Sequence, residues 1–99
     1  MLTLVAMLWP HTGQERALIE YEDSVLALLP THGGRLMGRV RNTGQSEGPF
    51  EIQLIEFADE TAMMNYMSDP DRTALSAEHA AAIERTEVVR VSVIEPREI

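Results

Sequence analysis

The sequence predicts an α+β domain in which two helical segments cover one face of a four-stranded antiparallel sheet, in the order β-α-β-β-α-β. Two observations predict this fold. The period of the apolar residues alternates along the chain between two, typical of strands, and 3.6, typical of helices. A chain of 99 residues is also long enough for one core only. We therefore expect a single domain over residues 1–99, with a C-terminal tail from about residue 95.

The composition excludes several classes of protein. With 44% hydrophobic and 24% charged residues, the chain is typical of a globular domain rather than a disordered tail or a coiled coil. The net charge is −8, and all eight basic residues are arginines. Because such a surface repels phosphate backbones and anionic lipids, we expect neither a nucleic acid nor a membrane as partner. The absence of cysteine excludes disulfides and cysteine-bound zinc.

The N-terminal half contains the first strand and the first helix. Residues 1–9 are apolar on both faces, which is typical of a strand inside a sheet that is covered on both sides. This stretch is too short to span a membrane and has no basic residue ahead of it, so we expect no signal peptide and a cytoplasmic location. A helical period follows from Gln14 to Thr31, and Pro30 and Gly33-Gly34 mark its end. Glu22 lies within the apolar stripe, and we interpret it as an edge carboxylate that reaches solvent.

The next two strands form a hairpin. Residues 35–42 and 50–57 alternate between apolar and polar side chains, and a loop rich in Gly and Ser joins them. Asp59 is a suitable N-cap for a short helix that extends through Met67. The hairpin and this helix continue the predicted order of elements.

The C-terminal part completes the fold. Asp69-Pro70 predicts the start of a second helical segment, which continues to about Arg85. Residues 87–94 predict the last strand, and Pro96 ends it. The whole order is that of the ferredoxin-like split β-α-β arrangement. Two helices cover only one face of such a sheet, so the economical way to cover the other face is a second copy, sheet against sheet. We therefore expect a homodimer.

Several short segments between about residues 15 and 94 resemble one known family. They are Tyr21, His32-Gly33-Gly34-Arg35, Ile55-Glu56-Phe57, Asp59-Glu60-Thr61-Ala62, Tyr66 and Ser68. The chain resembles domain-of-unknown-function family 1330, in the dimeric α/β-barrel superfamily that also holds antibiotic-biosynthesis and haem-degrading monooxygenases. The resemblance implies a ferredoxin-like fold and a dimer, and it matches Tyr21, Glu56 and Tyr66 to family positions. Arg72 stands where the family tends to carry a tyrosine.

His79 is the first candidate catalytic residue. Its spacing from Leu75, Ala82 and Ile83 places it on the inner face of the second helical segment, directed toward the sheet. A neutral imidazole there is suited to act as a general base. The resemblance also implies a possible haem, because haem-degrading relatives bind iron through a histidine on that helix; we otherwise expect no cofactor. The alternative is a core histidine bonded to a carbonyl.

Glu56 is the second candidate. It shares the face of Ile52 and Leu54, so we expect its carboxylate to enter an apolar pocket, have a raised pKa and relay protons. The alternative is an ion pair across the sheet with one of three arginines, Arg39, Arg41 or Arg90.

The predicted substrate-binding set consists of Tyr66, Arg39, Tyr21 and His32, with Tyr66 as a hydrogen-bonding wall. The three histidines of the chain lack ligand spacing, so we expect no metal site. Two functions remain open. One is a small-molecule enzyme, monooxygenase- or isomerase-like, with a pocket between sheet and helices. The other is a non-catalytic metabolite-binding or interaction module.

Overall fold

The computed structural model describes residues 1–95 and has the predicted order of elements. The strands are β1 (Leu2–Pro10), β2 (Gly34–Arg41), β3 (Glu51–Phe57) and β4 (Ile83–Arg90). The helices are α1 (Glu15–Leu26), α2 (Glu60–Met67), α3 (Pro70–Thr73) and α4 (Ser76–Ala82), with a 3₁₀ turn over Leu29–His32. The four strands form one sheet in the order β2-β3-β1-β4, and every neighbouring pair is antiparallel. This confirms the predicted ferredoxin-like α+β fold.

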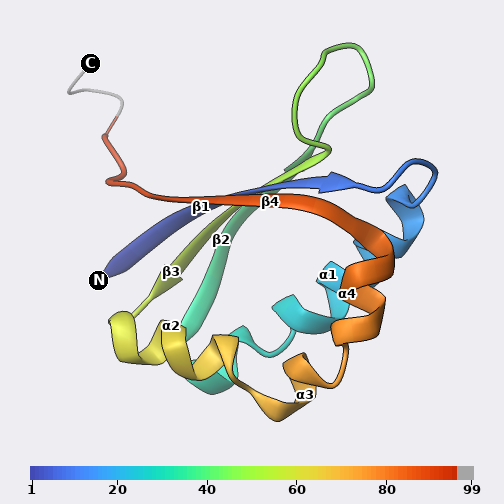
Figure 1. Cartoon of the computed structure of the whole chain (residues 1–99). Coiled ribbons are helices and arrows are strands. Elements are labelled where there is room, and N and C mark those ends of the chain that lie inside the picture. Colours follow the sequence, from blue (N-terminus) through green and yellow to red (C-terminus); the bar gives the residue numbers. More distant parts are fainter. Residues whose placement is uncertain (96–99) are drawn as a thin grey trace.

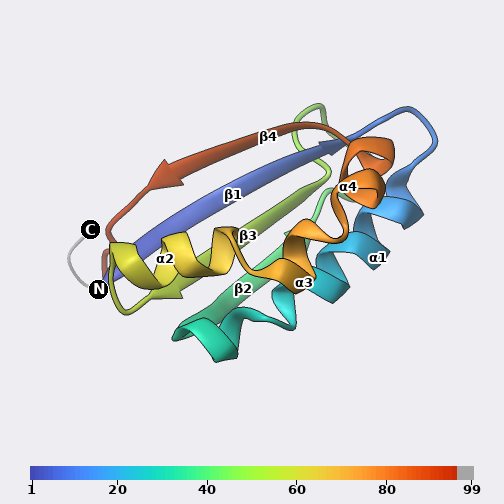
Figure 2. The ribbon, with the colours of Figure 1, turned by 60° about the horizontal axis from the view of Figure 1, so that its bottom comes forward.

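All four helices lie on one face of the sheet (Figures 1 and 2). We call this the inner face and the opposite one the outer face. On β1, the residues Leu4, Ala6 and Leu8 are buried beneath the helices, so they define the inner face. Figure 2 shows α2 under one end of the strands and α1 with α4 under the other. No helix of residues 1–95 is both long and apolar enough to cross a membrane.

The first helix ends earlier than Thr31, the predicted end. It stops at Leu26, because Pro30 lacks an amide hydrogen and its ring would clash with the carbonyl of that residue. The 3₁₀ turn follows, and Gly33 closes it at a φ of 67°, a conformation that favours glycine. The interpretation of Glu22 as solvent-reaching is wrong, since only 6% of this residue is exposed.

The second helical segment also differs from the prediction. It is broken into α3 and α4, and β4 runs from Ile83 to Arg90 rather than over residues 87–94. Pro96, the predicted end of this strand, lies outside the described residues. The alanines of residues 80–82 extend the helical pattern, but Ile83 is already extended and pairs with Pro10 of β1. Backbone pairing with the long strand β1 thus outweighs the local helix preference. Both predicted N-caps are confirmed: Asp59 accepts from the Ala62 amide at 2.8 Å, and Asp69 from the Asp71 amide at 2.7 Å.

The core consists of two clusters on the inner face. One lies toward α2 and contains Leu4, Leu26, Leu29, Ile55, Phe57 and Tyr66. The other lies toward α4 and contains Leu8, Leu18, Tyr21, Val25, Ala82 and Ile83. Residues of both clusters border a cavity, so the helices enclose a space that they do not fill.

Candidate functional site

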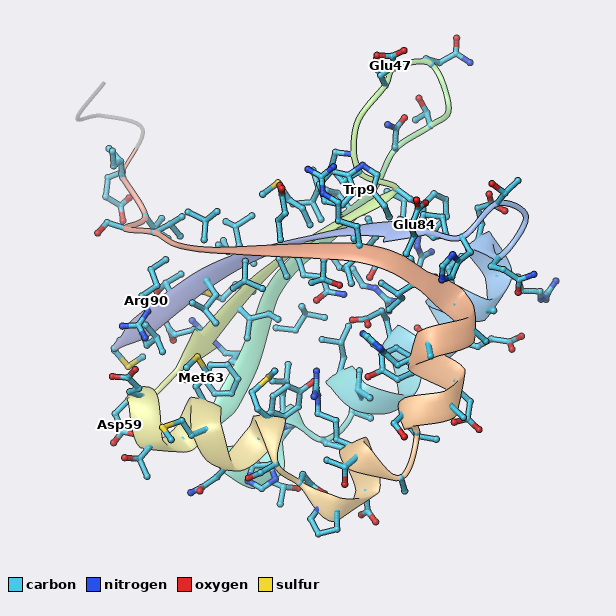
Figure 3. All side chains as sticks on the ribbon, viewed as in Figure 1. Trp9, Glu47, Asp59, Met63, Glu84 and Arg90 are labelled. Carbon is cyan, nitrogen blue, oxygen red and sulfur yellow. The ribbon has the colours of Figure 1, made fainter. Side chains whose placement is uncertain are left out.

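The cavity lies between the inner face of the sheet and the helices and has a volume of about 380 Å³. Most of its wall is apolar, formed by residues such as Leu4, Ala6, Ile55, Phe57, Met63 and Val88. Figure 3 shows Met63 directed from α2 toward the sheet and Trp9 on the other side of the sheet. A smaller set of polar side chains completes the wall: Tyr21, Glu22, Gln53, Arg72, His79 and Thr86. A concave apolar space with a few polar groups is typical of a small-molecule site.

His79 reaches this cavity from α4. Burial lowers the pKa of His79 below its ordinary value of 6.5, and the positive charge of Arg72 lowers it further. The imidazole is therefore neutral near pH 7 and can accept a proton. The Tyr21 ring packs edge-on against it, with ring centroids 5.2 Å apart, which limits the orientation of the imidazole.

Tyr66 contributes its ring rather than its hydroxyl. The hydroxyl donates a hydrogen bond to the Val25 carbonyl at 2.9 Å. Burial raises the pKa of Tyr66 to about 12, so the phenol stays protonated. Since its donor is already in use, Tyr66 acts as a rigid wall that ties α2 to α1.

Arg72 on α3 lines the same cavity, and its guanidinium carbon lies 5.2 Å from the centroid of the Tyr66 ring. Sequence reasoning did not include it among the candidate site residues. The one signal available was its place at a position where the resembling family tends to carry an aromatic residue. A cationic side chain in this mainly apolar wall favours a negatively charged group, a property that the sequence analysis missed.

A buried polar cluster borders the cavity on the β3 side. The Gln53 amide donates to one oxygen of Glu22 and one of Glu51, each at 2.7 Å. Glu51 is completely buried and also accepts from Nε of Arg39 at 2.8 Å and Nε of Arg41 at 2.9 Å. Burial raises the pKa of Glu22 above its ordinary value, so its carboxyl holds a proton more readily than a surface glutamate.

A bulge in β2 makes this cluster possible. The register with β3 shifts between Leu36 and Gly38, so one extra residue, Met37, separates the two halves of the strand. After the bulge, Arg39 lies opposite Gln53 and Arg41 opposite Glu51, both on the inner face. The bulge thus brings two arginines onto the face that carries the buried carboxylate.

Three of the predicted site residues come together at the cavity: His79, Tyr66 and Tyr21. Arg39 does not line it, because its guanidinium is bound to Glu51 and, at 2.6 Å, to Asp23. His32 does not line it either. Its Nε2 pairs with Oδ2 of Asp69, which lowers the pKa of that carboxyl and ties the 3₁₀ turn to α3.

Glu56 lies on the wrong face for the predicted role. It does share the face of Ile52 and Leu54, but this is the outer face, since Glu56 pairs in register with Thr3. The inner positions of β3 are Glu51, Gln53, Ile55 and Phe57. The prediction that Glu56 enters the cavity is therefore wrong; its carboxylate accepts from Arg35 at 3.3 Å instead of any of the three expected arginines.

Within residues 1–95, no group of three or more metal-ligating side chains is close enough to hold an ion. The expectation of no cofactor stays a prediction. The cavity, with one neutral imidazole, one guanidinium and one buried carboxyl, can bind a small molecule and exchange a proton with it.

Comparison with known proteins supports the fold. No protein-family model and no curated protein sequence matches this chain, so the resemblance to family 1330 stays a prediction. Among solved structures, protein Atu4242 from Agrobacterium tumefaciens is similar with a TM-score of 0.76 at 17% identity, over 97% of this chain and 96% of that chain.

Two further similar structures are described as dimeric and of unknown function, with a ferredoxin-like fold. One, from Bacteroides fragilis, has a TM-score of 0.73 at 13% identity, over 93% of this chain and 95% of its own. The other, from Jannaschia sp. CCS1, has a TM-score of 0.68 at 24% identity, over 93% of this chain and 98% of its own. Similarity at these identities establishes the fold alone.

Proposed function

We propose that this protein is a homodimeric small-molecule enzyme, in which the cavity of each protomer binds a mainly apolar molecule and His79 removes a proton from it. The observation that carries this proposal is a neutral imidazole in the wall of an apolar cavity of about 380 Å³. Kinship with family 1330, which the sequence resembles, is part of the same proposal.

The chemistry follows from the state of His79. In the proposed step a C–H or O–H bond of the ligand breaks, its electron pair stays on the ligand, and the proton moves to a ring nitrogen of His79. The apolar wall excludes water that would otherwise compete for the proton. Such a step begins both isomerisation of a carbon acid and oxygenation of a phenol or enol, so it serves either of the two predicted reaction classes.

The outer face of the sheet supports the homodimer. It carries apolar side chains with large exposed fractions, among them Val40 at 59%, Val89 at 47% and Ile52 at 37%. No helix of residues 1–95 covers them (Figure 1). Pairing of two outer faces would remove this surface from water, and two similar structures are described as dimeric.

The catalytic part is tested by proton exchange. Three carbon acids, phenylpyruvate, phenylacetone and acetylacetone, are incubated with the protein in D₂O, and loss of the acidic proton is followed by NMR. We expect exchange of at least one of them, and a loss of about 100-fold or more in His79→Gln. The matched control is His11→Gln, because His11 bonds to the Ala80 carbonyl outside the cavity.

Equal exchange rates in the wild type and in His79→Gln would contradict the role of His79. Binding without exchange would favour the alternative, a non-catalytic metabolite-binding module. The assembly is tested separately by light scattering after chromatography. We expect Ile52→Asp to give a monomer, whereas Met64→Asp, which changes an exposed residue of α2, leaves the dimer intact.

A further inference from the structure

We infer that the ligand of the cavity is a small carboxylic acid with an apolar body, and that Arg72 binds its carboxylate. This inference rests on the proposed function, because it concerns the molecule bound in the same cavity.

Arg72 differs from every other arginine that the structure describes. Each of the others forms an ion pair with a carboxylate; these are Arg16, Arg35, Arg39, Arg41, Arg85 and Arg90. The chain carries 16 acidic side chains, yet within residues 1–95 none of them pairs with Arg72. In a protein with twice as many acids as bases, an arginine without a carboxylate partner is an unusual feature that needs an explanation.

The contacts of Arg72 fix its position but leave donors free. Nη1 donates a long hydrogen bond of 3.4 Å to the Met67 carbonyl, and the guanidinium lies over the ring of Tyr66. Nε is buried and has no hydrogen-bond partner within the described part of the chain. A buried donor without an acceptor is costly, and more so when it carries charge. An anion that enters the cavity would satisfy it.

The charge of Arg72 reaches the whole polar side of the cavity. It lowers the pKa of each of the four titratable groups there, namely Tyr21, Glu22, Tyr66 and His79, although burial sets the direction of each net shift. The net effect of Arg72 is therefore a positive potential inside a protein whose overall charge is −8.

Glu22 is the one carboxyl among the cavity-lining residues, but it does not take the place of the ligand. One of its oxygens accepts from Gln53, and burial raises its pKa, so it is a weak counter-ion for Arg72. A carboxylate has two coplanar oxygens that match the fork of a guanidinium. A carboxylate also carries a single charge, which one arginine can balance. A phosphate monoester carries about two charges, but the mainly apolar wall of this cavity supplies one cation.

The test compares acids with their neutral amides. Three pairs are titrated by calorimetry: phenylacetate and phenylacetamide, 4-phenylbutyrate and 4-phenylbutyramide, octanoate and octanamide. We expect at least one acid to bind the wild type about tenfold or more tightly than its amide. In Arg72→Gln this ratio falls to about twofold or less, because the acid loses the charge-assisted hydrogen bonds of the guanidinium. Arg16→Gln removes the same charge from an exposed site and keeps the wild-type ratio.

The other outcomes contradict either the role of Arg72 or the proposed function. Equal affinity of acid and amide for the wild type, or an acid preference that persists in Arg72→Gln, would overturn the inference and leave the proposed function standing. Failure of all six compounds to bind would overturn the inference, and a failure of the three carbon acids to exchange would overturn the proposed function as well. A second measurement needs no ligand. If Arg72 serves to bind an anion and does not stabilise the free protein, Arg72→Met has a melting temperature equal to or above that of the wild type. A fall of more than about 4 °C would instead show a structural role.

Discussion

The two faces of the sheet reverse the usual distribution of residues. The outer face exposes apolar side chains such as Val40, Ile52 and Val89, whereas the inner face buries charged ones, with Glu51 completely inaccessible. Each face therefore carries groups without a partner. The outer face lacks a cover, which a second copy would provide. On the inner face most polar groups satisfy one another. Among residues 1–95, two buried side-chain donors lack an acceptor: Nη2 of Arg39 in the buried cluster and Nε of Arg72 at the cavity.

The largest expected effect is the loss of the buried carboxylate on the inner face. Glu51→Ala removes the acceptor of Arg39, Arg41 and Gln53 together. Since breaking a buried ion pair leaves an uncompensated charge, we expect the free energy of unfolding to fall by about 3–5 kcal/mol. Urea denaturation followed by circular dichroism measures it.

The matched control is Glu56→Ala on the outer face of the same strand. Its partner Arg35 has a side chain that is 69% exposed, so we expect a loss below about 1 kcal/mol. Equal losses in the two variants would contradict the contrast between the faces. To separate folding from assembly, both variants are compared at several protein concentrations.

The second prediction concerns Tyr66, whose hydroxyl ties α2 to α1 through the Val25 carbonyl. Tyr66→Phe removes this hydrogen bond and keeps the ring, so we expect a loss of about 1 kcal/mol. Tyr21→Phe is the control, since the hydroxyl of Tyr21 has no hydrogen-bond partner among residues 1–95. A loss in Tyr66→Phe no larger than that in Tyr21→Phe would show that Tyr66 holds the helices by ring packing alone.

The sequence allowed the fold to be predicted because the fold depends on periodicity, which is local. It also predicted the N-caps Asp59 and Asp69, whose acceptor role needs only residues within one turn. The start of β4 was placed too late, because the pairing of Ile83 with Pro10 joins distant parts of the chain. Alternation cannot tell which face of a strand the helices cover, and this explains the error on Glu56.

The site was predicted less well than the fold for the same reason. His79, Tyr66 and Tyr21 were found because they lie on helix faces directed toward the sheet. Glu22 was misjudged because its partner Gln53 comes from a strand that is far along the chain. Arg72 was missed because its significance lies in the lack of a carboxylate partner, and only the folded structure shows which of the many carboxylates lie nearby.

The third prediction uses the raised pKa of Glu22. A folded-state pKa above the ordinary value means that the folded protein binds this proton more tightly than the unfolded chain. The resulting stabilisation is present below pH 4.5 and is lost as the pH rises through the folded-state value. Glu22→Gln keeps the acceptor for Gln53 without the charge. We therefore expect the free energy of unfolding of Glu22→Gln to rise relative to that of the wild type between pH 4 and pH 8, by less than about 1 kcal/mol.

The smallest expected effect on the free energy of unfolding comes from His79, and its pH dependence is opposite to that of Glu22. Its lowered pKa means that the folded protein binds this proton less tightly than the unfolded chain does. The contribution to stability is therefore present above pH 6.5 and is lost as the pH falls through the folded-state value. Because the residue is only half-buried, solvent screens the effect, and we expect a few tenths of a kcal/mol.

Denaturation at pH 5 and pH 7.5 measures this effect, with His79→Gln expected to lose less stability on acidification than the wild type. An acid that binds at Arg72 would place a negative charge in the same cavity and favour the protonated imidazole. The stability that the wild type loses between pH 7.5 and pH 5 should then be smaller when a carboxylate ligand is bound. If this loss of stability becomes larger instead, His79 and Arg72 do not share one site, and the polar side of the cavity is not a single binding region.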